Sequence, residues 1–277
     1  MRILVGTLYS GENEFEECLA AIQSQTYHNF DHLIIKDLPQ HEAHKKLYST
    51  FMSNSDNYEL LIKVDADTVL NTNHLFEDII RKFSENPWLE VMTIAVDDFF
   101  TGRRIQAGLQ ISRNTVTWDL DKDTAFPDIP NILTEHFLYD TVELAPAATH
   151  CKNPSRFQAF HYGVHRGIKA LQRIHSTTHW LGIQHVWNNF LRSQDVRLGL
   201  AVVGAELVYA GKFAKLDADY TKSTMLEHFK AFETMDSNQV KRKIHQLRFR
   251  NWGFLPNDLR RRLIRNKRSI YFQDDSK

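Results

Sequence analysis

Strand-like and helix-like segments alternate along the first hundred residues of the chain. Short apolar runs rich in Val, Ile and Leu are separated by segments whose apolar residues recur with the period of an α-helix. The runs predict strands at 2–7, 32–36, 59–64 and 89–96, and the intervening segments predict helices at 12–24, 42–52 and 73–84. Strands that alternate with helices favour a parallel sheet with right-handed crossovers. The sequence therefore predicts an α/β fold with a mostly parallel sheet flanked by helices.

The pattern changes after residue 100. Residues 103–117 alternate weakly between apolar and polar side chains, which is typical of an antiparallel hairpin or an edge strand. Residues 118–155 are rich in proline and aspartate and predict a long loop region with short elements, of the kind that forms a lid or a substrate wall. Further segments predict helices at 158–173 and 180–191, a short strand at 206–210, and helices over 221–270 with breaks at Gly253 and Pro256.

Charge is unevenly distributed, although the formal net charge is zero. Residues 241–268 contain eleven Lys or Arg and one acid, Asp258, so the rest of the chain is acidic. A basic helix with apolar residues suits an anionic membrane surface, and a solvated helix packed on the acidic body is the equal alternative. Nucleic acid is not an expected partner, because the body is acidic and no nucleic-acid-binding module is visible.

Three features favour the cytoplasm. The two cysteines, Cys18 and Cys151, do not make a disulfide framework, which favours a reducing compartment. Met1 leads into a strand-like run without the apolar region of a signal peptide, and no window is apolar enough to cross a bilayer. We expect a cytoplasmic protein, with association at the inner face of the membrane through the basic segment as an open alternative.

The apolar run 60–64 ends in two carboxylates, Asp65 and Asp67, which are one residue apart. If the strand continues, the two side chains point the same way, at the edge where ligands of open α/β sheets bind. Converging carboxylates repel each other unless a cation lies between them, and oxygen ligands favour Mg²⁺ or Mn²⁺. The alternative is a strand that ends in a solvated turn.

Several segments together resemble the family 2 glycosyltransferases of the GT-A fold. Residues 5–12, Val-Gly-Thr-Leu-Tyr-Ser-Gly-Glu, resemble the family's first strand and loop, and residues 25–31, Gln-Thr-Tyr-His-Asn-Phe-Asp, match its Gln-Thr-Tyr turn. Residues 32–37 resemble the next strand, and Asp65-Ala66-Asp67 falls where the metal motif belongs. Residues 160–166 resemble the acceptor-side segment, and residues 193–200 resemble the motif that carries the catalytic base.

The resemblance implies a Rossmann-like GT-A domain at 1–215, with a nucleotide-sugar half at 1–100 and an acceptor half at 101–215. Residues 216–277 would then be a helical, basic C-terminal extension. It also implies transfer of a sugar from a nucleotide-sugar donor to a hydroxyl acceptor, such as a cell-envelope glycan or lipid-linked saccharide. The reaction would invert the anomeric carbon and use Mn²⁺ or Mg²⁺.

The resemblance also assigns roles to individual residues. Thr7, Tyr9 and Asp37 would line the nucleotide site, and Asp67 would bind the metal directly. Asp65 would contact the ribose or a metal-bound water. The remaining assignments are Asp195 as the general base, Arg166 near the diphosphate and His228 as a further metal ligand. An N-cap is the alternative role for Asp195, because it directly precedes an apolar run.

Three other functions stay open. A nucleotidyltransferase would also use a metal-bound nucleotide, although the glycine-rich basic loop of such enzymes is missing after the first strand. A catalytically inactive relative would act as a binding or adaptor protein. A zinc hydrolase is the remaining possibility, since His161/His165 and His175/His179 have helical spacing, but neither pair forms a His-Glu-x-x-His motif.

Overall fold

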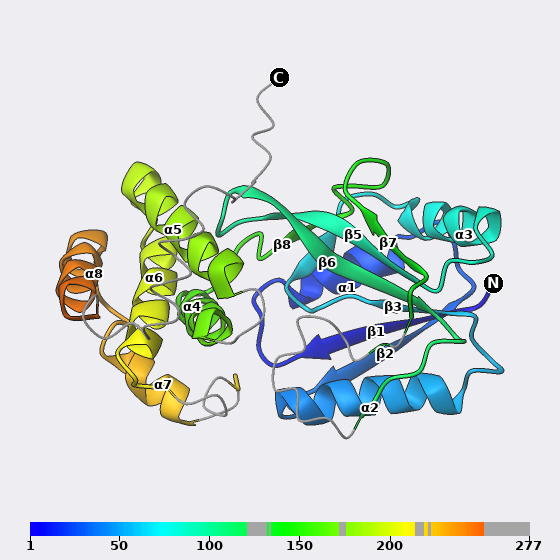
Figure 1. The fold of residues 1–277 in the computed structure, drawn as a ribbon, viewed down its shortest axis with the longest axis horizontal. Coiled ribbons are helices and arrows are strands. Elements are labelled where there is room, and N and C mark those ends of the chain that lie inside the picture. Colours follow the sequence, from blue (N-terminus) through cyan, green and yellow to red (C-terminus); the bar gives the residue numbers. More distant parts are fainter. Residues whose placement is uncertain (121–131, 133, 172–175, 214–218, 221–222, 252–277) are drawn as a thin grey trace. The chain divides into compact units, whose positions relative to one another are not determined.

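The computed structural model describes residues 1–120, 132, 134–171, 176–213, 219–220 and 223–251 (Figure 1). The chain forms two compact units. Unit 1 comprises residues 1–158 and 219–227 and contains the sheet, whereas unit 2 comprises residues 159–218 and 228–277 and is helical where it is described.

Unit 1 is built around one mixed sheet with the strand order β2-β1-β3-β6-β5-β8-β4, in which β7 also pairs with β5 (Figure 1). Its strands are β1 (Ile3–Tyr9), β2 (Phe30–Lys36), β3 (Leu60–Lys63), β4 (Thr68–Leu70), β5 (Val91–Asp98), β6 (Arg103–Arg113), β7 (Phe137–Asp140) and β8 (Ala148–His150). Strands β2, β1 and β3 are parallel neighbours, β6 runs antiparallel to β3 and β5, and β4 runs antiparallel to β8. The predicted α/β fold with a mixed sheet and flanking helices is confirmed.

Helices cover both faces of this sheet because successive strand residues point to opposite sides. Ile3 and Val5 of β1 join one core cluster with Ile22 of α1 (Phe15–Gln23), and the same cluster takes in α3 (Leu75–Glu85). Leu4, between them, joins the other cluster with Leu47 of α2 (Gln40–Ser53). The apolar run of β1 is therefore buried on both faces, as its uninterrupted hydrophobicity predicts.

The structure of the region after residue 100 agrees in part with the elements that the sequence predicts there. Strand β6 is antiparallel, as expected, but the edge alternative is wrong, because β6 lies between β3 and β5. Residues 118–155 do contain short elements, namely β7, β8 and an isolated bridge between Trp118 and Ile132. Residues 121–131 and 133 of this region lie outside the described part of the chain.

Unit 2 is formed by α4 (Arg156–Leu171), α5 (Ser176–Ser193), α6 (Val196–Tyr209), α7 (Ser223–Lys230) and α8 (Ser237–Asn251), with the first residues of α4 and α7 assigned to unit 1. Every residue of α6 from Leu198 to Tyr209 is buried. The predicted strand at 206–210 is therefore wrong, since its first four residues complete α6. A helix that is apolar on all sides has no periodicity, so a short stretch of it cannot be told from a buried strand by pattern.

Glycines allow α4 and α6 to approach closely within unit 2. A Cβ atom on Gly163 of α4 would lie 1.7 Å from the carbonyl oxygen of Ala201, and one on Gly204 of α6 would lie 2.4 Å from that of Phe160. The two backbones thus pack directly against each other, which only residues without a side chain permit.

The structure describes part of the predicted C-terminal extension, namely residues 219–220 and 223–251, which contain α7 and α8. Its boundary near residue 215 lies within the undescribed residues 214–218, and the predicted breaks at Gly253 and Pro256 lie within 252–277. The extension therefore stays a prediction. None of the helices in the described part of the chain is both long and apolar enough to span a membrane.

Candidate functional site at the end of the parallel strands

The carboxyl ends of β1, β2 and β3 meet at one edge of the sheet. Tyr9 is the last residue of β1, and Asp37 directly follows β2 and donates its backbone N–H to Tyr9 O over 2.9 Å. Asp65 lies two residues beyond the end of β3, where the backbone N–H of Ala66 still donates to Leu8 O over 3.3 Å. The structure thus brings Tyr9, Asp37 and Asp65 to the same edge.

The side chains at the first two strand ends differ in accessibility. Tyr9 stacks on Phe15 with ring centroids 4.0 Å apart, and Lys36 Nζ lies 5.5 Å from the Tyr9 ring centroid. Asp37 is exposed and has a positive φ of 55°. Thr7 is fully buried, and its hydroxyl lies 2.9 Å from His32 Nε2. A direct contact of the Thr7 side chain with a ligand would therefore require the sheet edge to open.

The two aspartates of the Asp-x-Asp motif face different partners. Strand β3 ends at Lys63, and the chain then turns, with Thr68 N–H donating to Asp65 O over 2.9 Å. The strand therefore does not continue through Asp67, and the condition for two parallel side chains is not met. Asp65 pairs with Lys63 Nζ at 2.5 Å and keeps 43% of its side chain exposed, whereas the Asp67 side chain turns toward β8.

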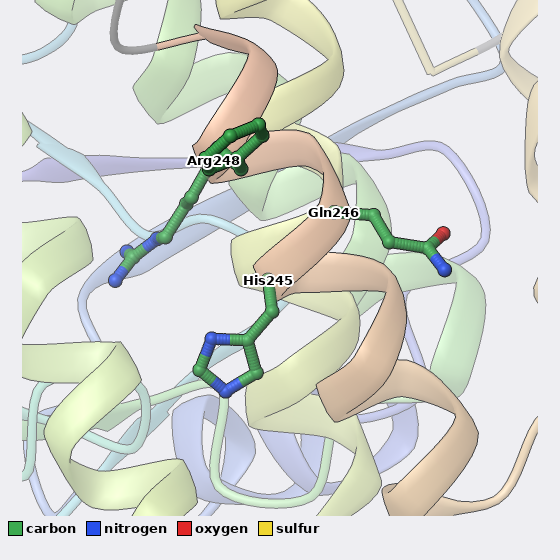
Figure 2. Close-up of a pocket in the computed structure, with 4 residues that line it drawn as sticks. His245, Gln246 and Arg248 are labelled. Atoms are coloured by element: carbon green, nitrogen blue, oxygen red, sulfur yellow. The ribbon is translucent and has the colours of Figure 1, made fainter.

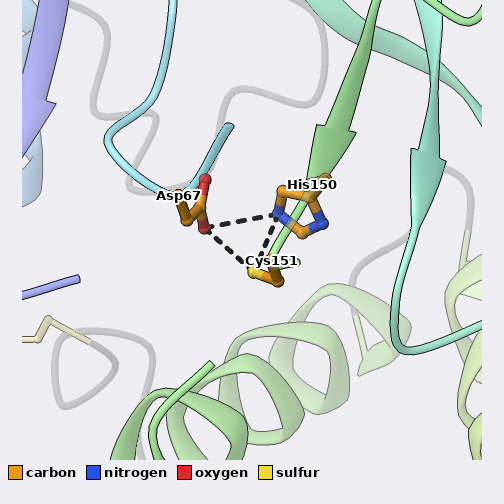
Figure 3. A group of neighbouring side chains, drawn as sticks. All are labelled: Asp67, His150 and Cys151. Carbon is orange, nitrogen blue, oxygen red and sulfur yellow. Dashed lines mark hydrogen bonds and ion pairs between the residues drawn. The ribbon is translucent and has the colours of Figure 1, made fainter. Parts of the chain in front are cut away.

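Asp67 forms a compact group with His150 and Cys151 (Figure 3). Cys151 Sγ donates to Asp67 Oδ2 over 3.2 Å, His150 Nε2 lies 3.4 Å from the same oxygen, and Sγ and Nε2 are 3.5 Å apart. The backbone N–H of Cys151 also donates to Asp67 O over 2.7 Å, which holds Cys151 at a positive φ of 52°. An oxygen, a nitrogen and a sulfur atom thus lie within reach of one ion.

Strand register explains how residues so distant in sequence meet. In the β4–β8 pair His150 lies opposite Thr68, the neighbour of Asp67, and in the β5–β8 pair it lies opposite Asp98. Asp98 Oδ1 accepts a hydrogen bond from His150 Nδ1 over 2.7 Å, and its Oδ2 accepts from the backbone N–H and hydroxyl of Thr101. The imidazole is therefore fixed between two carboxylates.

The electrostatics of this group reflect its charged neighbours. Burial alone would lower the pKa of His150, but the negative charges of Cys151 and Asp67 and the hydrogen bonds to Asp67 and Asp98 raise it well above its usual value. Burial and the nearby carboxylate raise the pKa of the Cys151 thiol. Burial would also raise the pKa of Asp67, yet the charge and hydrogen bond of His150 hold it well below its usual value.

Glu12 adds a third carboxyl group to this region. Burial, followed by the charges of Asp67 and Asp65, raises its pKa to about 7, although the backbone N–H of Ser10 donates to Glu12 Oε2 and opposes the shift. A carboxyl group that titrates near neutral pH beside other acids is typical of functional sites.

The remaining predicted site residues belong to unit 2. Asp195 caps α6, because its Oδ1 accepts from Arg197 N–H over 2.9 Å, and it also pairs with the Arg197 guanidinium at 2.7 Å. Burial would raise the pKa of Asp195, but Arg197 lowers it below its usual value. The N-cap alternative is confirmed, and the role as a general base stays a prediction.

Two further residues of unit 2 have aromatic neighbours. The Arg166 guanidinium lies 5.2 Å from the Tyr162 ring centroid. The ring centroids of His228 and Phe213 are 4.7 Å apart. Their predicted contacts with the diphosphate and the metal stay predictions.

No histidine pair with helical spacing forms a metal site in the described residues. His161 and His165 stack with ring centroids 6.0 Å apart, but neither belongs to a described group of three possible ligands. His175 lies outside the described residues. These histidines therefore give no support to the zinc-hydrolase alternative.

A surface hollow in unit 2 lies along one helix, α8, and is lined by His245, Gln246, Arg248 and Phe249 (Figure 2). Two of the polar residues that line it, Arg248 and His245, contact neighbouring helices. Arg248 pairs with Glu206 of α6 at 2.7 Å and lies over the ring of Trp187, which His245 also contacts edge-on. The hollow is thus a by-product of how α8 packs and offers no catalytic arrangement.

Comparisons with known proteins leave the function to be argued from these residues. No protein-family model matches the chain, and no curated protein matches it. Among solved structures, A197 from STIV matches 50% of this chain and 81% of its own at 16% identity and a TM-score of 0.35. A glycosyltransferase involved in glycosylation of the major capsid of PBCV-1 matches 39% of this chain and 59% of its own at 12% identity and a TM-score of 0.28. TarS from S. aureus matches 87% of this chain and 55% of its own at 13% identity and a TM-score of 0.35.

The sequence did not single out four residues of this site, which are Glu12, Asp98, His150 and Cys151. Glu12 is the last residue of the opening motif, so the resemblance contained a signal for it. The adjacent pair His150-Cys151 was a weaker signal, because two potential ligands next to each other in sequence have no characteristic spacing. Asp98 had no signal beyond ending an apolar strand.

Proposed function

We propose that this chain is a glycosyltransferase that moves a sugar from a nucleotide-sugar donor to a hydroxyl acceptor. One observation carries the proposal: Tyr9 ends β1, Asp37 directly follows β2, and Asp65 and Asp67 lie two and four residues beyond the end of β3, the three strands being parallel neighbours. Ligands of open α/β sheets bind at this edge. The same residues are those that the resemblance to family 2 glycosyltransferases assigns to the donor.

The proposed roles follow from the chemistry of each side chain. The stacked ring of Tyr9 offers a flat surface for the nucleotide base, and the exposed carboxylate of Asp37 accepts hydrogen bonds from it. Asp65, held by Lys63, accepts hydrogen bonds from the ribose hydroxyls. A divalent ion bound at Asp67 would shield the charge that develops on the departing diphosphate.

The assignments in unit 2 complete the proposal. Asp195 is the proposed general base that takes the proton of the acceptor hydroxyl in a single displacement with inversion. Arg166 is proposed to contact the diphosphate, and His228 to add a metal ligand. Residues 1–100 would bind the donor and 101–215 the acceptor, a saccharide or lipid-linked saccharide.

The predicted location completes this picture. The basic segment within 216–277 would contact an anionic membrane surface on the cytoplasmic side, where a lipid-linked acceptor would be found. This part of the proposal rests on the charge of the segment alone.

Donor binding is the first test. A panel of nucleotide sugars is screened for thermal stabilisation with and without a divalent ion. A donor present at about 100 times its Kd should stabilise the protein by roughly 2.7 kcal/mol. That corresponds to a rise in melting temperature of about 5–10 °C. The stabilising donor is then incubated with candidate acceptors, and release of nucleoside diphosphate is measured.

Matched variants connect this activity to the sheet edge. Asp37→Asn and Asp65→Asn should weaken donor binding. Asp31→Asn is the control, because Asp31 lies near the opposite end of β2, where it pairs with Arg2 at 2.8 Å. Full donor turnover in both edge variants would refute the proposal. Pyrophosphate release from a nucleoside triphosphate would instead establish a nucleotidyltransferase, and donor binding without turnover would establish a binding protein.

A further inference from the structure

The separations between the ligand atoms of Asp67, His150 and Cys151 are close to those that a tetrahedral metal ion requires. Zinc binds oxygen and nitrogen at about 2.0–2.2 Å and sulfur at about 2.3 Å. At tetrahedral angles, such bonds place ligand atoms about 3.3–3.6 Å apart. Two of the three observed separations fall in this range, 3.4 Å between Nε2 and Oδ2 and 3.5 Å between Sγ and Nε2, and the third, 3.2 Å between Sγ and Oδ2, is slightly shorter.

The surroundings of these three residues resemble the second layer of a metal site. A metal-binding histidine usually donates its other ring N–H to a carboxylate, which orients the free nitrogen toward the ion. His150 Nδ1 has this partner in Asp98, whose side chain is fully buried and is itself fixed by Thr101. Gln158 Nε2 lies 3.6 Å from Cys151 Sγ, where an amide donor would stabilise a thiolate.

The chemical groups of the three ligands determine which metal ion the site favours. We propose that Asp67, His150 and Cys151 bind one zinc-type transition-metal ion through a carboxylate, an imidazole and a thiolate, with a fourth position open. Thiolate and imidazole favour zinc over Mg²⁺ or Mn²⁺, which prefer oxygen ligands. Asp65, the other carboxylate of the motif, is engaged by Lys63. The ligand set therefore departs from the oxygen-rich metal site that the sequence motif suggests.

A coordination position without a protein ligand is typical of a catalytic metal ion and not of a purely structural one. Structural zinc sites have four protein ligands, whereas catalytic sites have three and leave one place for water or substrate. The side chains of His150 and Asp67 keep 18% and 20% of their surface exposed, so this side of the group is accessible. A role in contacting the donor diphosphate rests on the proposed function, but the binding of the ion does not.

Metal analysis of the full-length protein tests the binding directly. After dialysis against Zn²⁺ and removal of free metal, the wild-type protein should retain about one zinc ion per chain, which is the stoichiometry of a mononuclear site. Replacement of zinc by Co²⁺ should produce the near-ultraviolet charge-transfer band of a cobalt–thiolate bond. Mg²⁺ and Mn²⁺ should not displace the zinc at equal concentration.

Matched variants identify the ligands. Cys151→Ser should abolish the cobalt–thiolate band and the zinc content, while Cys18→Ala, which removes the other cysteine, should preserve both. Asp98→Asn should weaken zinc affinity about 10- to 100-fold but keep the band at saturating cobalt, because the thiolate ligand is intact. Circular dichroism of each variant confirms that the protein remains folded.

The outcomes separate this inference from the proposed function. Retention of zinc by Asp65→Asn with loss of donor turnover would support both, and retention of zinc without any glycosyl transfer would refute the proposed function alone. A folded wild-type protein that retains no zinc would overturn the inference, as would a cobalt band that survives Cys151→Ser. Rapid alkylation of Cys151 at the same rate with EDTA and with Zn²⁺ would likewise overturn it.

Discussion

Replacement of glycine by alanine should destabilise the protein at Gly163, where α4 packs closely against α6, and should stabilise it at Gly182 of α5. A Cβ atom on Gly163 would lie 1.7 Å from Ala201 O and 2.5 Å from Ala201 C, where ordinary contact begins at 3.4 Å. Both atoms are backbone, so no side chain can rotate away, and the helices must separate by up to about 1.7 Å, the difference between 3.4 and 1.7. Overpacking of this kind costs about 1–3 kcal/mol.

The control is Gly182 of α5, around which a new Cβ atom would meet nothing within 4 Å. Gly182→Ala should stabilise the protein by about 0.5–1 kcal/mol, because alanine loses less backbone entropy in a helix. Gly163→Ala should gain the same amount but lose more to overpacking, for a net loss of about 2 kcal/mol. For a chain of this size the melting temperature should fall by about 4–8 °C for Gly163→Ala and rise by about 1–4 °C for Gly182→Ala.

Differential scanning calorimetry of the two variants and the wild type measures these shifts, and urea unfolding followed by tryptophan fluorescence gives an independent value. Zinc content should be unchanged in both variants, since the three ligands proposed for the ion all lie in unit 1. A Gly163→Ala protein as stable as Gly182→Ala would refute the close approach of α4 and α6.

Three further predictions concern ionisable groups. The pKa of Glu12 rises from 4.5 to about 7 on folding, so its protonated form favours the native state. Its contribution to the free energy of unfolding should be fully present below pH 4.5 and should be lost as the pH rises through 7, a loss of at most about 3 kcal/mol. Glu12→Gln should remove this pH dependence, which is measured by urea unfolding in the presence of EDTA. Arg248→Met should cost about 3 kcal/mol in urea unfolding, because it removes the guanidinium that pairs with the buried carboxylate of Glu206, and Glu206→Gln in the same protein should restore most of that loss. Asp195→Asn should lower the melting temperature only slightly, because asparagine caps helices equally well and the lost ion pair with Arg197 is partly exposed, but it should slow glycosyl transfer by about 100-fold or more if Asp195 is the base. An equal loss of transfer and stability in Asp195→Asn would instead point to a purely structural role.

Local pattern was sufficient for much of unit 1. The predicted strands and helices of the first hundred residues match β1 to β3, β5 and α1 to α3, because each segment buries a continuous apolar face and is bounded by polar turns. The positions of Tyr9, Asp37 and Asp65 followed from this order, since the ends of parallel neighbouring strands meet at one edge. In unit 2 the same approach failed at 206–210, because α6 is apolar on every side and carries no period.

The amino-acid sequence by itself determined which segments form the parallel strands and which polar residues end them, because both depend on side-chain periodicity within a few residues. Only the tertiary structure decided what Asp67 contacts. The chain turns after Lys63, and the register of β8 against β4 and β5 then brings His150 and Cys151 to Asp67 and Asp98 across 84 and 52 residues of sequence. Such pairing depends on the packing of the whole sheet, so no local pattern contains it.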